Sequence, residues 1–202
     1  MPALMAEAEP PAGLRERKKK ETRDRIVLAA FELFQTRGYD EATLSQIADR
    51  AQVAVRTVSN YFPQKIDLLV AYREDILSVF EESLRRTRNQ DPLRRIRSAL
   101  VSSARENQRH PNGRLAQRLL ARHGSYRALA RIQDRFRTDL HEAVAAVDLR
   151  EGVDRQLAVL VLAASHLAVI QRWAGGEGPS LTTSVERMFD IWVQGVAPPA
   201  VG

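Results

Sequence analysis

The segment 43–62 constrains the fold most tightly. Apolar residues recur at helical spacing over 44–51, and after a three-residue interruption a second helical stretch runs until Pro63 breaks it. Thr43 is followed three residues later by Gln46, which is a capping-box pattern at a helix N-terminus. The spacing therefore predicts two short helices joined by a tight turn, which is the geometry of a helix-turn-helix.

The rest of the chain also has helical spacing. Upstream of the segment, one face of a first helix is predicted to be apolar at Ile26, Ala29, Ala30, Leu33 and Phe34, and Gly38 is predicted to end that helix. Further helices are predicted over about 64–88, 92–109, 113–122, 125–147, 152–174 and 182–194. No long stretch alternates with period two. The fold class is therefore all-α, with a disordered tail at 1–13, a three-helix head at 14–63 and a larger helical body at 64–202.

The second short helix is expected to have a buried side and a polar side. Val58 and Phe62 are spaced i, i+4 and can face the core, which leaves an outward face formed by Arg56, Thr57, Ser59 and Asn60. Arginine can pair with guanine and asparagine with adenine, while threonine and serine can contact bases or phosphates. Spacing alone does not separate this interpretation from an ordinary solvated surface helix.

Composition excludes several other classes. The chain has no cysteine, so it has neither a disulfide framework nor a thiolate metal site. The longest apolar-rich stretch, 157–170, is shorter than a membrane span needs, and 1–13 lacks the basic head and apolar run of a signal peptide. The predicted location is cytoplasmic, with no membrane partner. The net charge of +6 permits a polyanionic partner without establishing one.

Several motifs together resemble a known family. The stretches Thr43-Leu44-Ser45-Gln46-Ile47-Ala48, Ala51-Gln52-Val53 and Arg56-Thr57-Val58-Ser59-Asn60-Tyr61-Phe62-Pro63-Gln64-Lys65 are similar to the N-terminal domain of TetR-family regulators. So are Ala30-Phe31-Glu32-Leu33-Phe34 and Gly38-Tyr39-Asp40 upstream. The resemblance covers roughly residues 22–70. It implies a transcriptional regulator, most often a repressor, that binds a palindromic operator in double-stranded DNA as a homodimer and is released by a small-molecule inducer.

The resemblance implies a role for individual residues of the head. DNA contacts are expected from Thr43, Val55, Arg56, Thr57, Ser59, Asn60, Tyr61 and Lys65. Of these, Thr43, Tyr61 and Lys65 would contact the phosphate backbone, and the polar face of the second helix would carry base readout. A basic stretch at Arg15, Arg17, Lys18, Lys19 and Lys20 would follow the DNA as a flexible arm, or would simply be a solvated helix start.

The chain departs from the family pattern in the turn. Gln52 stands where glycine is usual, and Ala54 stands where a serine cap is usual. A left-handed conformation at Gln52 would cost roughly 1–2 kcal/mol, and loss of the cap about 1 kcal/mol. We expect the core of the head to hold the turn and the second helix despite both departures.

The body is expected to form the dimer interface and a ligand pocket. The last two helices are more apolar than one buried face requires, and the predicted interface residues are Leu160, Ala164, Leu167, Val185, Phe189 and Trp192. An ordinary intramolecular core is the alternative. The residues predicted to line the pocket are Phe80, Leu119, Tyr126, Leu129, Phe136, Ile170 and Trp173. Arginine ladders at 114–122 and 127–135 are solvated faces or contacts to an acidic ligand, for which an acyl-CoA-like molecule is one candidate.

Other functions have little support in the sequence. The four histidines, His110, His123, His141 and His166, have no metal-ligand spacing, and no nucleophile elbow or glycine-rich phosphate loop occurs. No catalytic residue, metal site or cofactor is predicted. A helical adaptor that does not bind DNA remains the other alternative.

Overall fold

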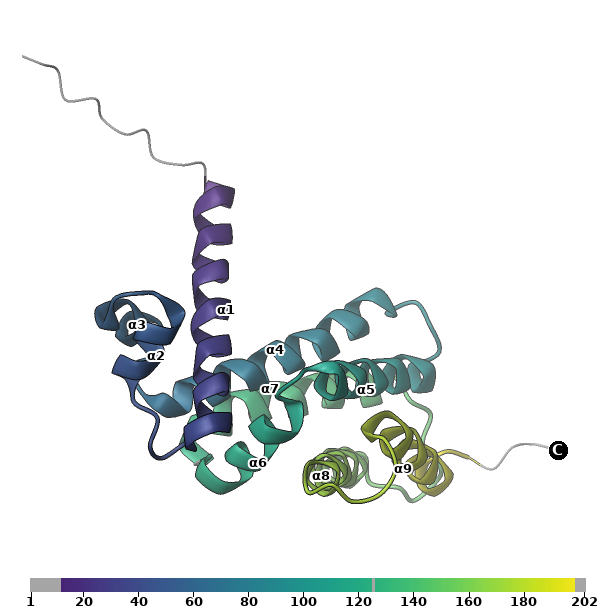
Figure 1. The fold of residues 1–202 in the computed structure, drawn as a ribbon. Helices are drawn as coiled ribbons and strands as arrows, with labels where there is room; N and C mark the ends of the chain where they lie inside the picture. Colours follow the sequence, from purple (N-terminus) through teal and green to yellow (C-terminus); the bar gives the residue numbers. More distant parts are fainter. Residues whose placement is uncertain (1–11, 125, 199–202) are drawn as a thin grey trace, which may run out of the picture. The chain divides into compact units, whose positions relative to one another are not determined.

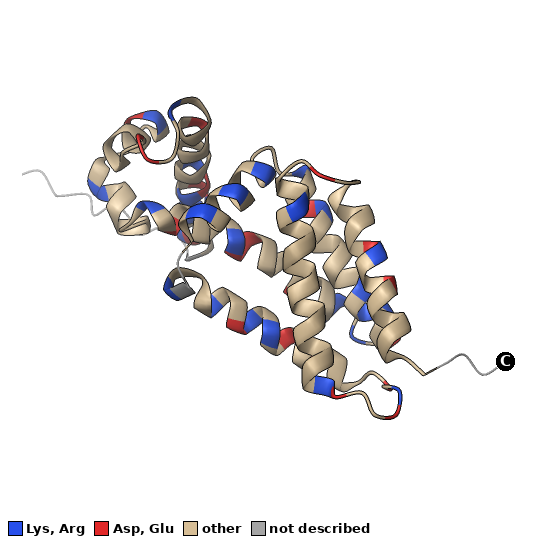
Figure 2. Cartoon of the chain, turned by 90° about the horizontal axis from the view of Figure 1, so that it is seen from below, with Lys and Arg blue, Asp and Glu red and all other residues tan. Residues whose placement is uncertain are grey.

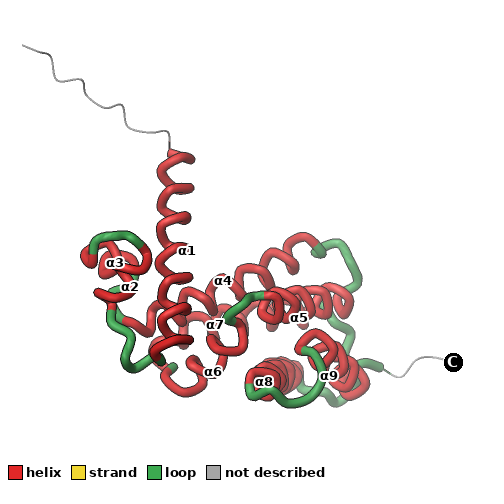
Figure 3. Tube along the Cα trace, in the orientation of Figure 1, coloured by secondary structure: helices red, strands yellow, loops and turns green. Residues whose placement is uncertain are grey.

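The computed structural model describes residues 12–124 and 126–198, which form two compact units (Figure 1). The N-terminal unit ends at Lys65, and the C-terminal unit begins at Ile66. The described part of the chain is helical and contains no strand, which confirms the predicted fold class (Figure 3). The tail predicted at 1–13 lies almost wholly outside the described residues.

The N-terminal unit consists of three helices and the first residue of a fourth. They are α1 (Ala12–Arg37), α2 (Leu44–Ala51) and α3 (Val55–Tyr61). α1 packs on α2, and α2 packs on α3. Their shared core includes the fully buried Ile26, Phe31, Ile47 and Val58. α1 ends where Gly38 adopts a φ of +91°, a left-handed conformation that glycine adopts without strain, as the sequence predicts.

The described residues of the C-terminal unit form the rest of α4 and five further helices. They are α4 (Lys65–Arg86), α5 (Pro92–Arg109), α6 (Gly113–His123), α7 (Tyr126–Ala145), α8 (Arg155–Ala174) and α9 (Leu181–Val196). Helix α5 packs on α6, α7 and α9, and α8 packs on α6, α7 and α9. One continuous apolar core, which includes Leu100, Leu140 and Leu162, lies among them.

Local signals in the sequence explain where these helices begin. Asp91 caps α5 by accepting a hydrogen bond from the Arg94 amide at 2.9 Å, and Pro92 occupies the first turn as predicted. Helix α9 begins at Leu181, one residue earlier than predicted, and Ser180 caps it by accepting a hydrogen bond from the Thr183 amide at 3.1 Å. Polar contacts also join the helices: the Trp192 indole N–H donates to the Ala158 carbonyl at 2.9 Å, and Arg97 pairs with Asp190 at 3.1 Å.

Candidate functional site

The turn between α2 and α3 has the predicted geometry. Thr43 and Gln46 form the complete capping box: the Gln46 amide donates to the Thr43 hydroxyl at 3.2 Å, and the Thr43 amide donates to the Gln46 side chain at 3.0 Å. At the other end of α2, Gln52 adopts a left-handed conformation with a φ of 54° and a ψ of 49°. The Val53 amide donates to the Ala48 carbonyl at 3.0 Å, which closes the helix end.

Helix α3 forms although neither usual residue is present. Ala54 occupies the N-cap position without a side-chain hydrogen bond, and residues 55–61 are helical. The buried Val58 and Phe62 anchor α3 to the core of the N-terminal unit. The expectation that this core holds the turn and the helix is therefore confirmed.

The strained conformation at Gln52 leads to a first prediction. Gln52→Gly should raise the free energy of unfolding of the N-terminal unit by about 1 kcal/mol, because glycine adopts a positive φ without the steric cost of a Cβ. Urea unfolding measures this change. The same substitution at Gln35, inside α1, is the matched control and should lower the free energy by about 1 kcal/mol. Equal effects at the two positions would show that Gln52 is not strained.

The outward side of α3 carries the polar residues that the sequence places there. Arg56, Ser59 and Asn60 are exposed, and Thr57 and Tyr61 are half-buried. Val55 is 45% exposed at the start of the helix. Thr43 is also exposed, at the N-terminus of α2. The structure thus presents a polar surface with one apolar residue, on a helix whose opposite side is buried.

Lys65, which the sequence predicts to contact the phosphate backbone, makes contacts within the N-terminal unit. Its ammonium group donates to the backbone carbonyls of Asp40 and Ala42, each at 3.0 Å, and lies 4.6 Å from the centre of the Tyr39 ring. These contacts close the loop between α1 and α2. Two of its three N–H donors are therefore used inside the N-terminal unit, and Lys65 primarily positions the loop that precedes Thr43.

The basic stretch near the N-terminus is helical. Arg15, Arg17 and Lys18 to Lys20 lie in the first half of α1. Arg17 pairs with Glu21 and Lys20 with Asp24, both one helical turn away. Of the two interpretations, the structure favours the solvated helix start over the flexible arm.

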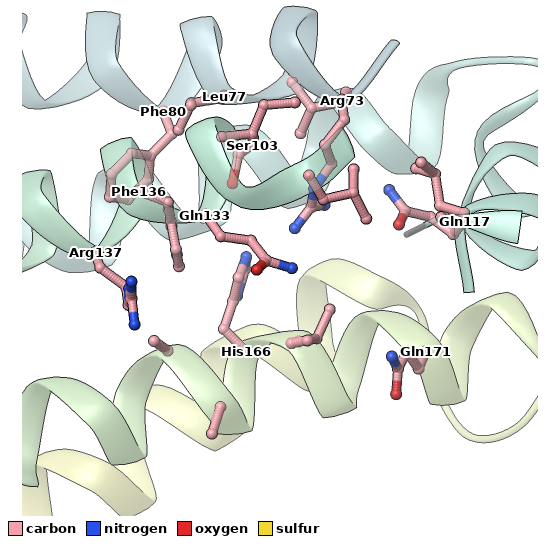
Figure 4. A pocket seen from close by; sticks show the side chains of 18 of the residues that line it. Arg73, Leu77, Phe80, Ser103, Gln117, Gln133, Phe136, Arg137, His166 and Gln171 are labelled. Atoms are coloured by element: carbon pink, nitrogen blue, oxygen red, sulfur yellow. The ribbon is translucent and has the colours of Figure 1, made fainter. Parts of the chain in front are cut away.

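The C-terminal unit contains a cavity of about 390 Å³ between α4, α5, α6, α7 and α8 (Figure 4). Its size is within the range of small-molecule sites. Most of its wall is apolar. The aliphatic and aromatic residues larger than alanine that line it are Ile76, Leu77, Phe80, Leu120, Leu129, Ile132, Phe136, Leu160 and Leu167. Three of the predicted pocket residues, Phe80, Leu129 and Phe136, are therefore among its lining.

Three other predicted pocket residues lie elsewhere. Ile170 and Trp173 are buried in the core of the C-terminal unit, and Leu119 is half-buried on α6 outside the cavity. Trp173 packs against the Arg114 guanidinium, 5.1 Å from the ring centre. The prediction for these residues rests on their apolarity, and apolar residues form both protein cores and cavity walls. The side chain of Tyr126 lies outside the described residues.

The polar part of the cavity was not predicted from the sequence. Arg73 from α4, Gln133 from α7 and His166 from α8 point toward one another there (Figure 4). Burial lowers the pKa of the Arg73 guanidinium, which stays charged. The sequence does contain a signal for Arg73, because it lies four residues after Leu69 and four before Leu77, within the apolar stripe of α4.

His166 is a neutral side chain in this environment. Burial, and secondarily the nearby Arg73 charge, lower its pKa to about 3. The ring stacks on Phe136 with the centres 5.5 Å apart, and its Nδ1 has no hydrogen-bond partner. His166 therefore adds a polar atom to the cavity wall but no charge at neutral pH.

The neutrality of His166 predicts a pH dependence. The folded protein leaves His166 unprotonated down to about pH 3, whereas the unfolded chain takes up a proton below about pH 6.5, so acid favours unfolding. Between pH 7 and pH 5, the wild type should lose about 2 kcal/mol more unfolding free energy than His166→Phe does. Urea titrations at the two pH values measure this difference. His141→Gln is the control, because His141 is exposed, and it should lose as much unfolding free energy between pH 7 and pH 5 as the wild type. An equal loss in His166→Phe and the wild type would contradict a neutral, buried His166.

The last two helices also present an apolar outer surface. Leu157, Leu160, Val161 and Leu167 of α8 are exposed, as is Ile191 of α9 at 70%. Helix α8 carries no charged residue between Arg155 and Arg172, as the uncharged front of Figure 2 shows. An open groove of about 860 Å³ runs along this surface and is lined in part by Leu157, Val161 and Ile191. We call the five exposed residues the α8–α9 face.

The α8–α9 face differs from the predicted dimer interface in α9. Leu160, Ala164 and Leu167 are exposed, and all three also line the cavity. Val185, Phe189 and Trp192 are buried in the core of the C-terminal unit. Their side chains therefore pack within the protomer and leave almost no surface for a partner. Ile191, which the prediction omitted, is the apolar residue that α9 exposes.

Comparisons with known proteins identify relatives of both units. Residues 26–72 match the family model described as "Bacterial regulatory proteins, tetR family". The chain is 34% identical over 88 residues to the transcriptional regulator TcmR of Streptomyces glaucescens, covering 43% of this chain and 39% of TcmR. It is 36% identical over 96 residues to the transcriptional repressor KstR of Rhodococcus jostii, covering 46% of this chain and 44% of KstR. The matches thus span about two fifths of these relatives, which are regulators rather than enzymes, in agreement with the predicted class.

Solved structures extend the similarity over most of the fold. SmeT, the repressor of a Stenotrophomonas maltophilia multidrug efflux pump, aligns with a TM-score of 0.74 at 23% identity, covering 89% of this chain and 92% of SmeT. Thermus thermophilus FadR, a repressor solved in complex with lauroyl-CoA, aligns with a TM-score of 0.63 at 26% identity, covering 89% of this chain and 99% of FadR. The similarity therefore includes the C-terminal unit as well as the matched N-terminal residues.

Proposed function

Because the chain belongs to the tetR family of bacterial regulatory proteins, we propose that it regulates transcription by reading operator DNA with α3. One observation carries the proposal. The side of α3 that holds it in the N-terminal unit is apolar and buried at Val58, while Arg56, Ser59 and Asn60 are exposed on the other side. A helix in the major groove needs this division between an anchored side and a polar reading side.

The exposed residues of this unit have separate roles in the proposal. Arg56 and Asn60 read base edges, because their side chains can form paired hydrogen bonds with guanine and adenine. Thr57 and Ser59 contact bases or adjacent phosphates, and Val55 meets a thymine methyl group. Thr43 and Tyr61 bind backbone phosphates, and such contacts position the protein without selecting sequence. Lys65 holds the loop before Thr43 and has one N–H donor left for a phosphate.

The proposed active form is a homodimer joined through the α8–α9 face. This face is apolar along the length of α8, and a second copy can cover it with the same surface under two-fold symmetry. Two copies of α3 would then read two symmetric half-sites of a palindromic operator. The alternative is that this face contacts a membrane, because α8 is long and apolar enough to cross one by length and composition. However, α8 buries its opposite side in the protein core at Leu162 and Ile170, which favours a partner chain and a cytoplasmic protein.

A small molecule in the cavity would control the release of DNA. Helix α4 contains Lys65 at its first residue and Arg73 on the cavity wall, about 12 Å apart along the helix axis. A ligand that binds one arrangement of α4 better than another shifts the protein toward that arrangement, and operator affinity changes with it. Repression with release by the ligand is the proposed mode, since KstR and SmeT are named repressors.

Gel shifts test the DNA-binding function. The full chain is mixed with DNA upstream of its own gene and, separately, with a shuffled sequence of the same composition. The proposal predicts a specific complex whose affinity falls by about 10³ between 50 and 200 mM salt. Tyr61→Phe should weaken binding to both DNAs alike, because it removes a phosphate contact. Failure to prefer any natural DNA over shuffled DNA, or the absence of salt dependence, would favour a helical adaptor.

A further inference from the structure

Arg73 is half-buried and points into the cavity of the C-terminal unit with a positive charge that the protein does not neutralise (Figure 4). Among the residues that the structure describes, no carboxylate pairs with Arg73, and burial is the main perturbation of its pKa. The cavity lining contains no aspartate or glutamate. A buried charge without a partner costs free energy, so the protein alone gives no reason to keep it there.

The other polar groups at the cavity do not change this charge. His166 is neutral, and its Nδ1 is buried without a hydrogen-bond partner among the described residues. Arg137 lies at the rim, is largely exposed and already pairs with Asp134. None of the arginines of the predicted ladders is among the residues that line the cavity. Arg118 donates to the Ala174 carbonyl at 3.3 Å, and Arg135 pairs with Glu81. The enclosed part of the cavity therefore carries a single positive charge.

We propose that the ligand of this cavity is an amphipathic monoanion, whose acidic head binds Arg73, Gln133 and His166 and whose apolar body lies against Phe80 and Phe136. This inference rests on the proposed regulatory function, since it names the class of molecule that would control DNA binding. A planar carboxylate fits best, because the guanidinium can bind it with two parallel hydrogen bonds. One positive charge matches a carboxylate more closely than a phosphate monoester, which carries nearly two negative charges.

The size of the cavity restricts the ligand further. About 390 Å³ is near the lower end of the range for small-molecule sites, and aliphatic and aromatic side chains form most of the wall. The cavity thus accommodates a medium-chain or aryl acid. A complete acyl-CoA would have to leave its nucleotide outside, at the rim where Arg137 lies.

Calorimetry with matched probes tests the proposal. Decanoate, decyl phosphate and decan-1-ol share one apolar chain and differ in the head, and 4-phenylbutyrate with its alcohol gives a second pair. The proposal predicts that wild-type protein binds the carboxylate of each pair more tightly than the alcohol, and decanoate more tightly than decyl phosphate. Arg73→Gln should weaken carboxylate binding about 10-fold to 100-fold and leave alcohol binding unchanged. Arg137→Gln is the matched control and should change carboxylate binding less than threefold.

Three outcomes would overturn the proposal. They are equal binding of the carboxylate and the alcohol, unchanged carboxylate binding in Arg73→Gln, and a larger loss in Arg137→Gln than in Arg73→Gln. A structural role for Arg73 is excluded by a second measurement. Without ligand, Arg73→Met should unfold at a Tm at least as high as the wild type, because it removes an unpaired buried charge; a lower Tm would assign Arg73 to the fold.

Comparison of the wild type with Arg73→Gln distinguishes failure of this inference from failure of the proposed function. If the chain selects no DNA but Arg73 controls decanoate binding, the regulatory function fails and the anion site stands. If the chain binds its operator but Arg73→Gln binds decanoate normally, only the anion site fails. If both hold, decanoate should release operator DNA from the wild type and fail to release it from Arg73→Gln at the same concentration.

Discussion

The double substitution Leu157→Glu and Ile191→Glu is expected to yield monomers whose affinity for operator DNA is at least about 100-fold lower. Both side chains are largely exposed on the α8–α9 face and line its groove, so the substitutions leave the protomer core intact. Two copies of the same interface would bring four carboxylates into an apolar contact, which is strongly unfavourable. A monomer binds only one half-site. It therefore loses the increase in affinity that comes from binding two half-sites at once, which is a factor of about 10² to 10⁴.

Sedimentation velocity and gel shifts measure the two effects together. Leu28→Glu is the matched control for assembly, because Leu28 is as exposed as Leu157 but lies on α1. It should leave the dimer intact. A double variant that still sediments as a dimer would contradict the proposed interface, and a monomer with undiminished operator affinity would contradict binding by two copies.

Gly113→Ala is expected to lower the free energy of unfolding of the C-terminal unit by about 3 kcal/mol. Gly113 is the first residue of α6, and a Cβ there would lie 2.0 Å from the backbone carbonyl oxygen of Asn107 and 3.3 Å from Trp173. Neither the end of α5 nor a buried indole can move away easily. Because the Tyr72 hydroxyl donates to the Asn107 side chain, the displacement would also disturb α4 one residue before Arg73.

Urea unfolding of the full chain gives this free energy directly. Gly13→Ala is the control, because no atom lies within 4 Å of a Cβ at that position, and it should change stability by no more than a few tenths of a kcal/mol. If Gly113→Ala is as stable as Gly13→Ala, the close approach of α6 to the end of α5 is wrong.

The helices of the N-terminal unit could be predicted because the sequence signals that begin and end them are local. The capping box at Thr43 and Gln46, the glycine after α1 and the proline after α3 each act within one turn of a helix. The Asp91 cap of α5 is a local signal of the same kind. Lys65 was different, because its partners lie 23 and 25 residues earlier and only the folded loop brings their carbonyls to its ammonium group.

The interface and pocket residues of the C-terminal unit were harder to predict, because apolarity does not show whether a side chain contacts the core, a cavity or a partner chain. Val185, Phe189 and Trp192 have the same spacing and hydrophobicity in the sequence as interface residues would, yet α9 turns them toward the protomer core. Ile170 and Trp173 are likewise predicted to line the pocket but lie in the core, because apolarity does not distinguish the two environments. The charge in the cavity was missed because it depends on three helices, α4, α7 and α8, that bring Arg73, Gln133 and His166 together.

Sequencing the DNA that the protein selects tests the central claim most directly. Genomic fragments are bound to wild-type protein and, in parallel, to Asn60→Ala, and the retained fragments are sequenced. Reading by α3 predicts that the wild type enriches a palindrome with half-site centres about 34–36 Å apart, or a multiple of this, and that Asn60→Ala loses preference at one symmetric pair of positions. Fragments without a shared sequence, or the same preference in both proteins, would contradict the claim that α3 reads DNA.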